Sequence, residues 1–390
     1  MSLRARLYRF WLKRRQKNVS ATKVIAIAFA AIILLGAGLL TLPAASRSGV
    51  SCGFLPALFT ATSATCVTGL VLYDTFTQWS GFGQVVIISL IQIGGLGFMS
   101  AATLFVFFLR RRIGLKQRLV MAQALSVSDM DGIVQLQKTV LKGSFAVEAM
   151  GALILFVRFL PEFGFANALK WGVFHSISAF CNAGFDLFGI ETPGAGMAIY
   201  ADDPYILTVV MLIIIIGGLG FVVWEELLAY RKTKTLSLHS RAVLITTAAL
   251  IIGGAVIYFI IELTEPDVFG EYGVTQRIFT SFFASVSART AGFSAAPLPT
   301  VNSFSKMFTI ILMFIGAAPG STGGGFKVTT FAIIAATAWS VIKGRNDTQI
   351  LKHIVPKQAV YKTLTVLCLS LAFAISGTFI VSLMNPDNDS

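Results

Sequence analysis

The sequence predicts an all-α integral membrane protein, and three observations lead to this fold class. First, 55% of the 390 residues are hydrophobic and only 13% are charged, which gives a mean hydropathy of +0.78. Second, the apolar residues form blocks long enough to cross a bilayer as helices. Third, basic residues gather in alternate loops between those blocks. This composition almost excludes a soluble enzyme, because soluble domains carry about 25% charged residues.

Seven apolar blocks are candidate membrane spans. A helix needs about 20 mostly apolar residues to cross roughly 30 Å of hydrocarbon. The first block is too long for the core of a signal peptide, so we interpret it as a retained helix. The blocks are residues 22–42, 82–109, 140–160, 205–230, 242–263, 307–342 and 359–384.

The basic residues behind the net charge of +13 are distributed as expected for a membrane protein and not as expected for a nucleic-acid-binding surface. Of the 31 Lys and Arg residues, 21 lie before the first block or in the loops after the second, fourth and sixth blocks, and three more, Lys23, Lys142 and Lys362, lie within the first four residues of the adjoining blocks. Positive loops stay in the cytoplasm, so we expect a cytoplasmic N-terminus in a multi-pass plasma-membrane protein. The surroundings are then the lipid bilayer, and no nucleic acid is expected. Four scattered cysteines and three isolated histidines support neither a disulfide framework nor a resident metal site.

Three short apolar pieces follow the first, third and fifth blocks, and a glycine motif ends each one. The pieces are residues 56–66, 171–181 and 278–288, and the motifs are Val67-Thr68-Gly69, Asn182-Ala183-Gly184 and Arg289-Thr290-Ala291-Gly292. A helix of this length rises only about 16 Å, which is about half of the hydrocarbon thickness. We therefore expect re-entrant half-helices rather than further spans.

The three pieces recur at a nearly constant interval, which indicates an internal repeat. Gly69 and Gly184 are 115 residues apart, and Gly184 and Gly292 are 108 residues apart. The segment IGGLGF occurs at residues 93–98 and again at 216–221. Small residues let membrane helices approach closely, so we interpret both copies as packing sites around the pore. Each repeat is expected to contain a spanning helix, a half-helix and a second spanning helix, an M1-P-M2 unit.

Half-helices that return through the bilayer as irregular backbone must be buried in protein or line water, because hydrocarbon leaves their polar groups unsatisfied. We therefore expect the three pieces to converge on an aqueous axis. Rings of backbone carbonyls can replace the hydration shell of a monovalent cation. Glycine suits such rings because it tolerates positive φ, and the negative end of each half-helix favours a cation.

At these residues the chain resembles the Trk/Ktr/HKT superfamily of potassium transporters, with the greatest similarity to the membrane subunits of bacterial Ktr systems. The resemblance runs from residue 22 onward. It implies pseudo-fourfold, K⁺-channel-like M1-P-M2 repeats, a homodimer of separate pores and a cytoplasmic ring of nucleotide-binding, RCK-type regulatory subunits. A nucleotide would act only through that partner. The motifs are residues 60–70 (TATSATCVTGL), 91–99 (IQIGGLGFM), 174–185 (FHSISAFCNAGF), 285–293 (SVSARTAGF) and 312–331 (LMFIGAAPGSTGGGFKVTTF).

The resemblance also implies which residues form the ion path. K⁺ would be the transported ion, with Na⁺ as a possible stimulating ion. The implied selectivity filter comprises Val67, Thr68, Gly69, Asn182, Ala183, Gly184, Thr290, Ala291 and Gly292. The implied gate comprises Gly316, Pro319, Gly320, Ser321, Thr322, Gly323, Gly324, Gly325 and Lys327. Proline and clustered glycines cannot sustain a helix, so we expect the sixth block to break at residues 316–325, the Gly-rich loop.

The repeats divide the chain into a basic N-terminus (1–21), three units (22–120, 121–235 and 236–345) and the beginning of a fourth (346–390). A further interval of roughly 110 residues places a fourth filter glycine near residue 400, beyond Ser390. We therefore expect the fourth half-helix and its second span to be missing here. Either the chain is truncated or another polypeptide supplies this quarter.

Several charged residues allow more than one interpretation. Lys327 lies near the pore or reaches toward the membrane interface, and Glu148 is either functional or held by a partner such as a hydroxyl. Arg289 is expected to brace the third motif by donating to carbonyls. The outer acids either concentrate cations at the pore mouth or form a solvated surface; they are Asp74, Glu162, Asp186, Glu191, Asp202, Asp203, Glu265, Asp267 and Glu271.

The sequence therefore predicts passive, channel-like K⁺ uptake through a glycine-lined filter. One alternative is a secondary transporter of another monovalent cation, such as Na⁺, which binds its substrate at discontinuous helices. Such transporters usually invert their repeats, whereas every unit here begins and ends on the basic side. A scaffold subunit of a membrane complex is a weaker alternative. An enzyme is not expected, because no nucleotide-binding or hydrolase motif is found.

Overall fold

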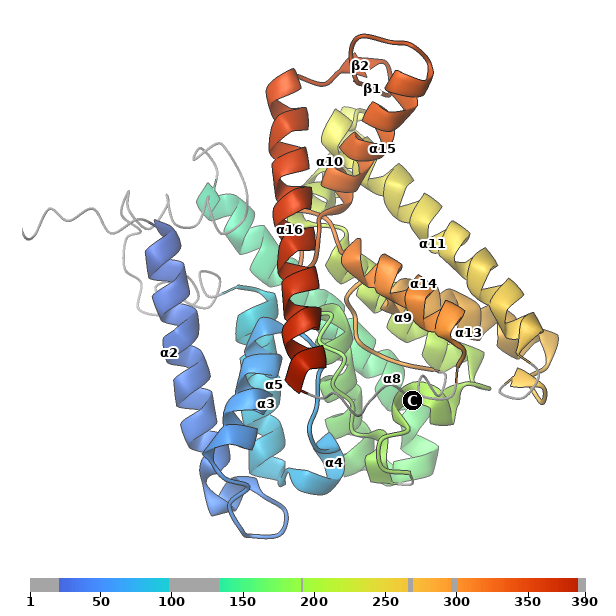
Figure 1. Ribbon diagram of the computed structural model, residues 1–390. Helices are drawn as coiled ribbons and strands as arrows, with labels where there is room; N and C mark the ends of the chain where they lie inside the picture. Colours follow the sequence, from blue (N-terminus) through green and yellow to red (C-terminus); the bar gives the residue numbers. More distant parts are fainter. Residues whose placement is uncertain (1–20, 98–132, 191, 266–268, 296–300, 385–390) are drawn as a thin grey trace, which may run out of the picture.

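The computed structural model describes residues 21–97, 133–190, 192–265, 269–295 and 301–384. This part of the chain is mostly helical, which confirms the predicted fold class (Figure 1). The α-helices are α2 (Ala21–Thr41), α3 (Phe54–Cys66), α4 (Thr75–Gln78), α5 (Gly81–Gly95), α8 (Ile133–Phe180), α9 (Pro204–Gly218), α10 (Phe221–Thr233), α11 (Leu238–Thr264), α13 (Val274–Ser287), α14 (Ser303–Phe314), α15 (Val328–Ile342) and α16 (Lys357–Met384).

Short elements connect these helices. The turns η1 (Pro43–Ala45), η2 (Phe188–Ile190) and η3 (Gly196–Tyr200) are 3-10 helices. The strands β1 (Gln349–Ile350) and β2 (His353–Ile354) pair antiparallel, with Gln349 opposite Ile354. This small hairpin joins α15 to α16 at one end of the molecule (Figure 1).

Four helices of the described chain are long and apolar enough to cross a membrane: α2, α8, α11 and α16. They contain the first, third, fifth and seventh predicted blocks. Helix α8 continues past its block into the second half-helix, with a bend at Gly164, whose φ is 69°. The span and the half-helix are therefore two helical stretches of α8 that meet at this kink.

The fourth predicted block is wrong as a continuous span. Its residues form α9 and α10, which meet at an angle of 99°. The break follows the pair Gly217 and Gly218, and Gly220 has a φ of 92° that no helix interior accommodates. Residues 213–224 around the bend are all apolar or glycine, so an apolar window does not detect it.

The second predicted block is only partly described. Helix α5 ends at Gly95, and Gly97 has a φ of 80°. Residues 98–109 of the block, the basic loop that follows it and residues 1–20 of the basic N-terminus lie outside the described residues.

The short helices that end in glycine motifs pack against the longer, membrane-sized helices. Helix α3 packs on α2 and α5, α9 packs on α8, and α13 packs on both α11 and α9. The largest buried side chains include Trp79, Trp171, Phe159 and Phe180, which belong to one continuous apolar core. Helix α16 packs on α15 and is otherwise exposed, with Thr363 as its buried residue. The ends of the half-helices therefore meet in the protein interior.

Candidate functional site: three glycine turns and a Gly-rich loop

Helix α3, the end of α8 and helix α13 terminate in the same kind of turn. The turns are residues 67–69, 182–184 and 290–292, named here the three glycine turns. In each turn the first and third residues have left-handed φ: 57° and 76° at Val67 and Gly69, 56° and 70° at Asn182 and Gly184, and 67° and 81° at Thr290 and Gly292. The repeat seen in the sequence thus corresponds to a repeated backbone conformation.

The middle residue of each turn is held by its own half-helix. The amide of Thr68 donates to Ser63 O at 3.0 Å, that of Ala183 to Ser178 O at 2.8 Å, and that of Ala291 to Ser287 O at 2.9 Å. Such bonds from beyond a left-handed cap to the last helical carbonyls are typical of helix C-termini. Since these amides point back into the helix ends, no amide of a middle residue is available to face a cation.

Two of the left-handed positions are occupied by unfavourable residues. Val67 and Thr290 are β-branched, and a positive φ is an outlier for such side chains. Residues held in sparsely populated conformations cost about 1–3 kcal/mol and cluster at functional sites. The three units keep this conformation with Val, Asn and Thr alike, so the surrounding structure rather than local preference imposes it.

The three glycine turns meet at one point. A Cβ added to Gly184 would lie 2.6 Å from Gly292 Cα, and a Cβ added to Gly69 would lie 2.9 Å from Ala183 O and 3.4 Å from Gly292 Cα. No side chain fits at Gly184 without displacing backbone. Three half-helix ends, with their negative dipole ends and adjacent carbonyls, suit a cation.

The two IGGLGF segments pack against the half-helices. A Cβ at Gly94 of α5 would overlap Thr65 O, and a Cβ at Gly217 of α9 would overlap Phe180 O. The close-packing interpretation of these glycines is therefore supported. The segment also ends its helix in both copies, because Gly97 and Gly220 are left-handed; this second role was missed, although the third glycine of the motif was a signal for it.

The Gly-rich loop separates α14 from α15 where Pro319 and the glycines predict a break. Its backbone pairs with itself: Gly316 N donates to Phe326 O at 2.9 Å, and Phe326 N donates to Phe314 O at 3.1 Å. The rings of Phe314 and Phe326 stack with centroids 5.4 Å apart. The irregular backbone thus satisfies several of its own polar groups, as non-helical backbone within a membrane must.

The Gly-rich loop lies directly against the second and third glycine turns. Thr322 Oγ1 donates to Phe180 O at 2.7 Å and accepts a bond from Asn182 Nδ2 at 3.4 Å. A Cβ added to Gly323 would lie 2.9 Å from Asn182 Nδ2 and 3.3 Å from Thr290 Oγ1. The structure therefore brings the residues of the implied filter and the implied gate into contact.

The bend between α9 and α10 holds the other side of the Gly-rich loop. Ala318 N donates to Gly218 O at 3.0 Å, Thr322 N to Gly217 O at 3.2 Å, and Phe221 N to Gly320 O at 2.8 Å. Two broken helices therefore satisfy one another's free backbone groups. Sequence reasoning found the break in the sixth block but missed its partner in the fourth.

Two basic side chains donate hydrogen bonds to the Gly-rich loop. Arg289, which is 8% exposed, donates from Nη2 to Gly316 O at 3.4 Å. Lys327 donates from Nζ to Gly323 O at 2.7 Å. The expected bracing by Arg289 is thus directed at the Gly-rich loop, and the Lys327 side chain is bonded to the same loop.

Glu148 has a partner in another helix. Gln92 Nε2 of α5 donates to both of its carboxylate oxygens, at 2.8 Å and 3.0 Å. The partner is an amide rather than the hydroxyl that the sequence suggested. Ser176 donates to the carbonyl of Glu148 instead, at 2.7 Å. This acid therefore fixes α8 against α5 behind the first and second glycine turns.

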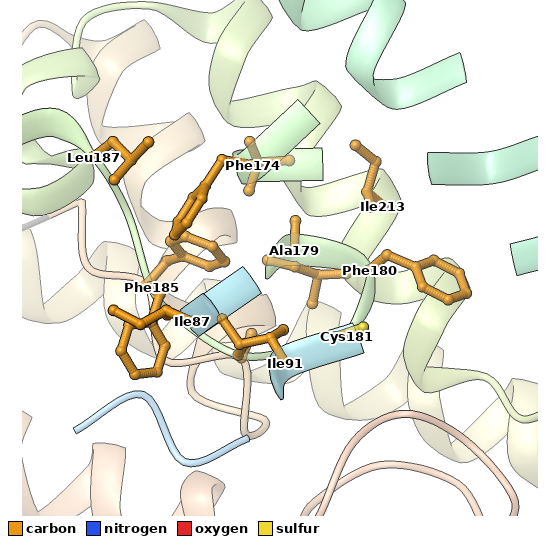
Figure 2. Close-up of a cluster of buried hydrophobic side chains, with 14 of the residues drawn as sticks. Ile87, Ile91, Phe174, Ala179, Phe180, Cys181, Phe185, Leu187 and Ile213 are labelled. Atoms are coloured by element: carbon orange, nitrogen blue, oxygen red, sulfur yellow. The ribbon is translucent and has the colours of Figure 1, made fainter. Parts of the chain in front are cut away.

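The half-helix at the end of α8 is enclosed by apolar side chains. Figure 2 shows Phe174, Ala179 and Phe180 of α8 with Ile87 and Ile91 of α5, and Phe185 and Leu187 beyond the second glycine turn. Phe185 and Leu187 are 1% and 0% exposed. Their backbone groups are held by Ser178 and His175 of the half-helix, two residues that sequence reasoning did not select.

The outer acids are spread over several contacts. Asp74 caps α4 and accepts a bond from Gly194 N at 3.3 Å. Asp186 accepts a bond from Phe188 N at 3.1 Å. Burial is the main cause that raises the pKa of Asp186 to about 6; the bond from the Phe188 amide lowers this pKa, and the nearby Asp74 carboxylate adds a smaller increase. Glu162 and Asp203 pair with Arg158, Glu265 accepts bonds from Asn302 and Ser305, and Glu191 and Asp267 lie outside the described residues.

Known proteins match the chain over nearly its whole length. It is 39% identical to the potassium/sodium uptake protein NtpJ of Enterococcus hirae over 373 residues, which are 95% of this chain and 81% of that protein. It is 38% identical to the Ktr system potassium uptake protein B of Bacillus subtilis over 361 residues, covering 93% of this chain and 80% of the relative.

A solved structure shares the fold. The crystal structure of the potassium transporter TrkH from Vibrio parahaemolyticus superposes with a TM-score of 0.69 at 16% sequence identity, covering 95% of this chain and 72% of that chain. The family described as "TrkH: Cation transport protein" matches residues 6–388. With this match and these relatives, the chain belongs to the TrkH family of cation transport proteins, which are ion transporters and not enzymes.

Proposed function

We propose that this chain is the K⁺-translocating membrane subunit of a Ktr/Trk-type uptake system. One observation carries the proposal: three left-handed glycines from distant segments meet where three half-helices end. The names of the relatives support K⁺ as the substrate, since they are potassium uptake proteins. Carbonyls at such a point supply the oxygen ligands that a dehydrated monovalent cation needs.

The filter in this proposal consists of the three glycine turns, residues 67–69, 182–184 and 290–292. The bonds from Thr68, Ala183 and Ala291 to their half-helices fix these turns before an ion arrives. The Gly-rich loop with Lys327 is the gate. Its contacts with Asn182 and Phe180 support this role, because they place the loop directly beside the proposed filter, where it would block the ion path.

The remaining expectations form part of the same proposal. Residues 22–120, 121–235 and 236–345 are three M1-P-M2 units, and 346–390 begins a fourth. The N-terminus lies in the cytoplasm of a plasma-membrane homodimer, and an RCK-type nucleotide-binding ring regulates the gate. The name of the Enterococcus hirae relative includes sodium, which supports a role for Na⁺ as a second or stimulating ion. A secondary transporter is not favoured, because the named relatives are potassium uptake proteins.

The test is uptake of K⁺ and Rb⁺ into cells that lack their own K⁺ uptake systems, with and without a Ktr regulatory subunit. We expect the native chain to restore growth at low K⁺ and to discriminate against Na⁺. Gly184→Ser should lower K⁺ selectivity over Na⁺, because no Cβ fits beside Gly292. Gly253→Ser is the matched control, since a Cβ at Gly253 meets no atom within 4 Å. Unchanged selectivity in Gly184→Ser would remove this residue from the filter.

A further inference from the structure

His175 is a buried titratable side chain that neither the filter nor the gate has used so far. It lies on the half-helix at the end of α8, nine residues before Gly184, and is 1% exposed. Its Nδ1 is 2.7 Å from Trp171 O, and its Nε2 is 3.1 Å from Leu187 N. Among the described residues, no group of three His, Cys, Asp or Glu side chains could hold a metal ion, so a ligand role is not supported.

These two contacts fix the protonation of the ring. The Leu187 amide can only donate, so Nε2 must accept and carries no proton. The proton then lies on Nδ1 and is donated to the carbonyl of Trp171. The ring also stacks on Phe188, with centroids 4.0 Å apart and an interplanar angle of 15°. Hydrogen bonds and stacking therefore hold a neutral imidazole of one tautomer in one orientation.

Ser178, on the same half-helix as His175, also binds the segment after Gly184. Its Oγ donates to Phe185 O at 2.7 Å and accepts from Phe185 N at 3.0 Å. Residues three apart share a helix face, and alternate residues of an extended segment point to one side. His175 thus bonds to the backbone of Leu187, and Ser178 bonds to the backbone of Phe185; each of these side chain–backbone pairs is called a rung here. The Ser178 rung begins at Phe185, the residue directly after Gly184.

The other two segments lack the histidine rung. Nine residues before Gly69 lies Thr60, whose hydroxyl donates to Pro56 O of its own helix at 3.0 Å. Nine residues before Gly292 lies Phe283, which has no polar side-chain atom. Ser287 of that segment does donate to Phe293 O. The histidine rung is therefore specific to the second segment among the described residues.

We propose that His175 is a positioning residue that determines ion selectivity, on the basis of the function proposed above. By accepting the Leu187 amide, its neutral ring holds residues 185–187 against α8 and so keeps the Gly184 carbonyl at the ion. Without the acceptor, a fully buried amide loses its partner and the segment after Gly184 shifts. The glycine turn then becomes less rigid, its carbonyls can move in around the smaller Na⁺ ion, and Na⁺ competes better with K⁺.

The first experiment measures Rb⁺ uptake and Na⁺ competition in three variants together with their abundance in the membrane. His175→Phe keeps an aromatic ring for stacking but removes the acceptor, and we expect its selectivity to fall about tenfold, the scale of one unsatisfied buried amide. His175→Gln restores an acceptor, and its selectivity should stay within about threefold of the native value. Thr60→Val, the matched control at the same place in the first segment, should leave selectivity unchanged.

The second experiment determines directly which ring nitrogen of His175 carries the proton in the native protein. In protein labelled with ¹⁵N-histidine, His175→Gln assigns the His175 signals among three histidines. We expect a protonated Nδ1 and a bare Nε2. A proton on Nε2 overturns the proposal, even if the Phe variant fails to reach the membrane. Native selectivity in His175→Phe, or an equal loss in His175→Gln, overturns it as well. If the native chain carries no K⁺, the proposed function fails instead, and the tautomer result is unaffected.

Discussion

The turns at residues 67–69 and 182–184 share a backbone conformation, but the chain that follows them is held very differently. After Gly184, Phe185 and Leu187 are 1% and 0% exposed and bonded to side chains of their half-helix. After Gly69, Leu70 and Leu72 are 62% and 52% exposed. The chain after the second turn is thus held by hydrogen bonds from side chains of its half-helix, whereas the chain after the first turn is exposed. The repeat keeps the backbone conformation of the turn, while the support of the turn varies from unit to unit.

The largest expected effect compares the glycines of these two turns. We expect Gly184→Ala to reduce K⁺ selectivity about 100-fold, because the added Cβ lies 2.6 Å from Gly292 Cα and a left-handed Ala costs about 1–2 kcal/mol. We expect Gly69→Ala to reduce it about tenfold, since its nearest atom is 2.9 Å away and the exposed chain after Gly69, which includes Leu70 and Leu72, can move to relieve the clash. Uptake of Rb⁺ against Na⁺ measures both, and equal losses would show that the difference in support has no consequence.

Stability should follow the same order. Ser178→Ala leaves two buried backbone groups of Phe185 without their partner, which should lower the free energy of unfolding by about 2 kcal/mol. Ser63→Ala removes only a bond to the exposed hydroxyl of Thr68, and about 0.5 kcal/mol is expected. Unfolding of the purified chain in detergent gives both values. A Ser63 variant as unstable as the Ser178 variant would contradict the comparison.

The contact of the Gly-rich loop with the second segment should restrain the gate. Thr322→Val keeps the side-chain volume but removes the bond to Phe180 O, so we expect the rate of K⁺ uptake to rise about fivefold, the scale of one lost hydrogen bond. Ser321→Ala is the matched control, because its hydroxyl bonds to Ala318 O within the loop. Equal rates in Thr322→Val and the native chain would separate this contact from gating.

The smallest effect concerns the outer mouth beside the second turn. Since burial raises the pKa of Asp186 to about 6, the carboxylate is ionised at pH 7 and mostly protonated at pH 5. Its negative charge attracts K⁺ only when ionised, so the apparent affinity for K⁺ should fall about twofold as external pH drops from 7 to 5. Asp186→Asn should have the low affinity at both pH values. An Asp186→Asn variant that keeps the full pH dependence would assign it to another group.

The sequence was sufficient for features that depend on local chemistry. The half-helices follow from apolar pieces too short to span, and the break at residues 316–325 follows from proline and glycine. The left-handed φ of Gly69, Gly184 and Gly292 agrees with the expectation that glycine suits those positions because it tolerates a positive φ.

Features that depend on long-range contacts were not predictable. The bend at Gly220 lies in uniformly apolar sequence, and it is stabilised by bonds to residues 318–322, about 100 positions away. The His175 rung needs the chain to reverse at Gly184, so a lone histidine on an apolar helix gave no signal. The partner of Glu148 likewise comes from α5, 56 residues earlier.

The hydrogen bonds between the Gly-rich loop and the bend of α9 and α10 couple any movement of α10 to the loop. Helix α10 has 13 residues and carries Arg231 and Lys232 in its last turn, so its far end is about 20 Å from the bend. A sideways displacement of about 2 Å at that end turns the bend by roughly 5–6° over this length. Because Phe221 N is bonded to Gly320 O, such a rotation strains the loop at once. Because α10 is about 20 Å long, a weak sideways force at its far end produces a larger force at the bend, and so on the loop that contacts the glycine turns.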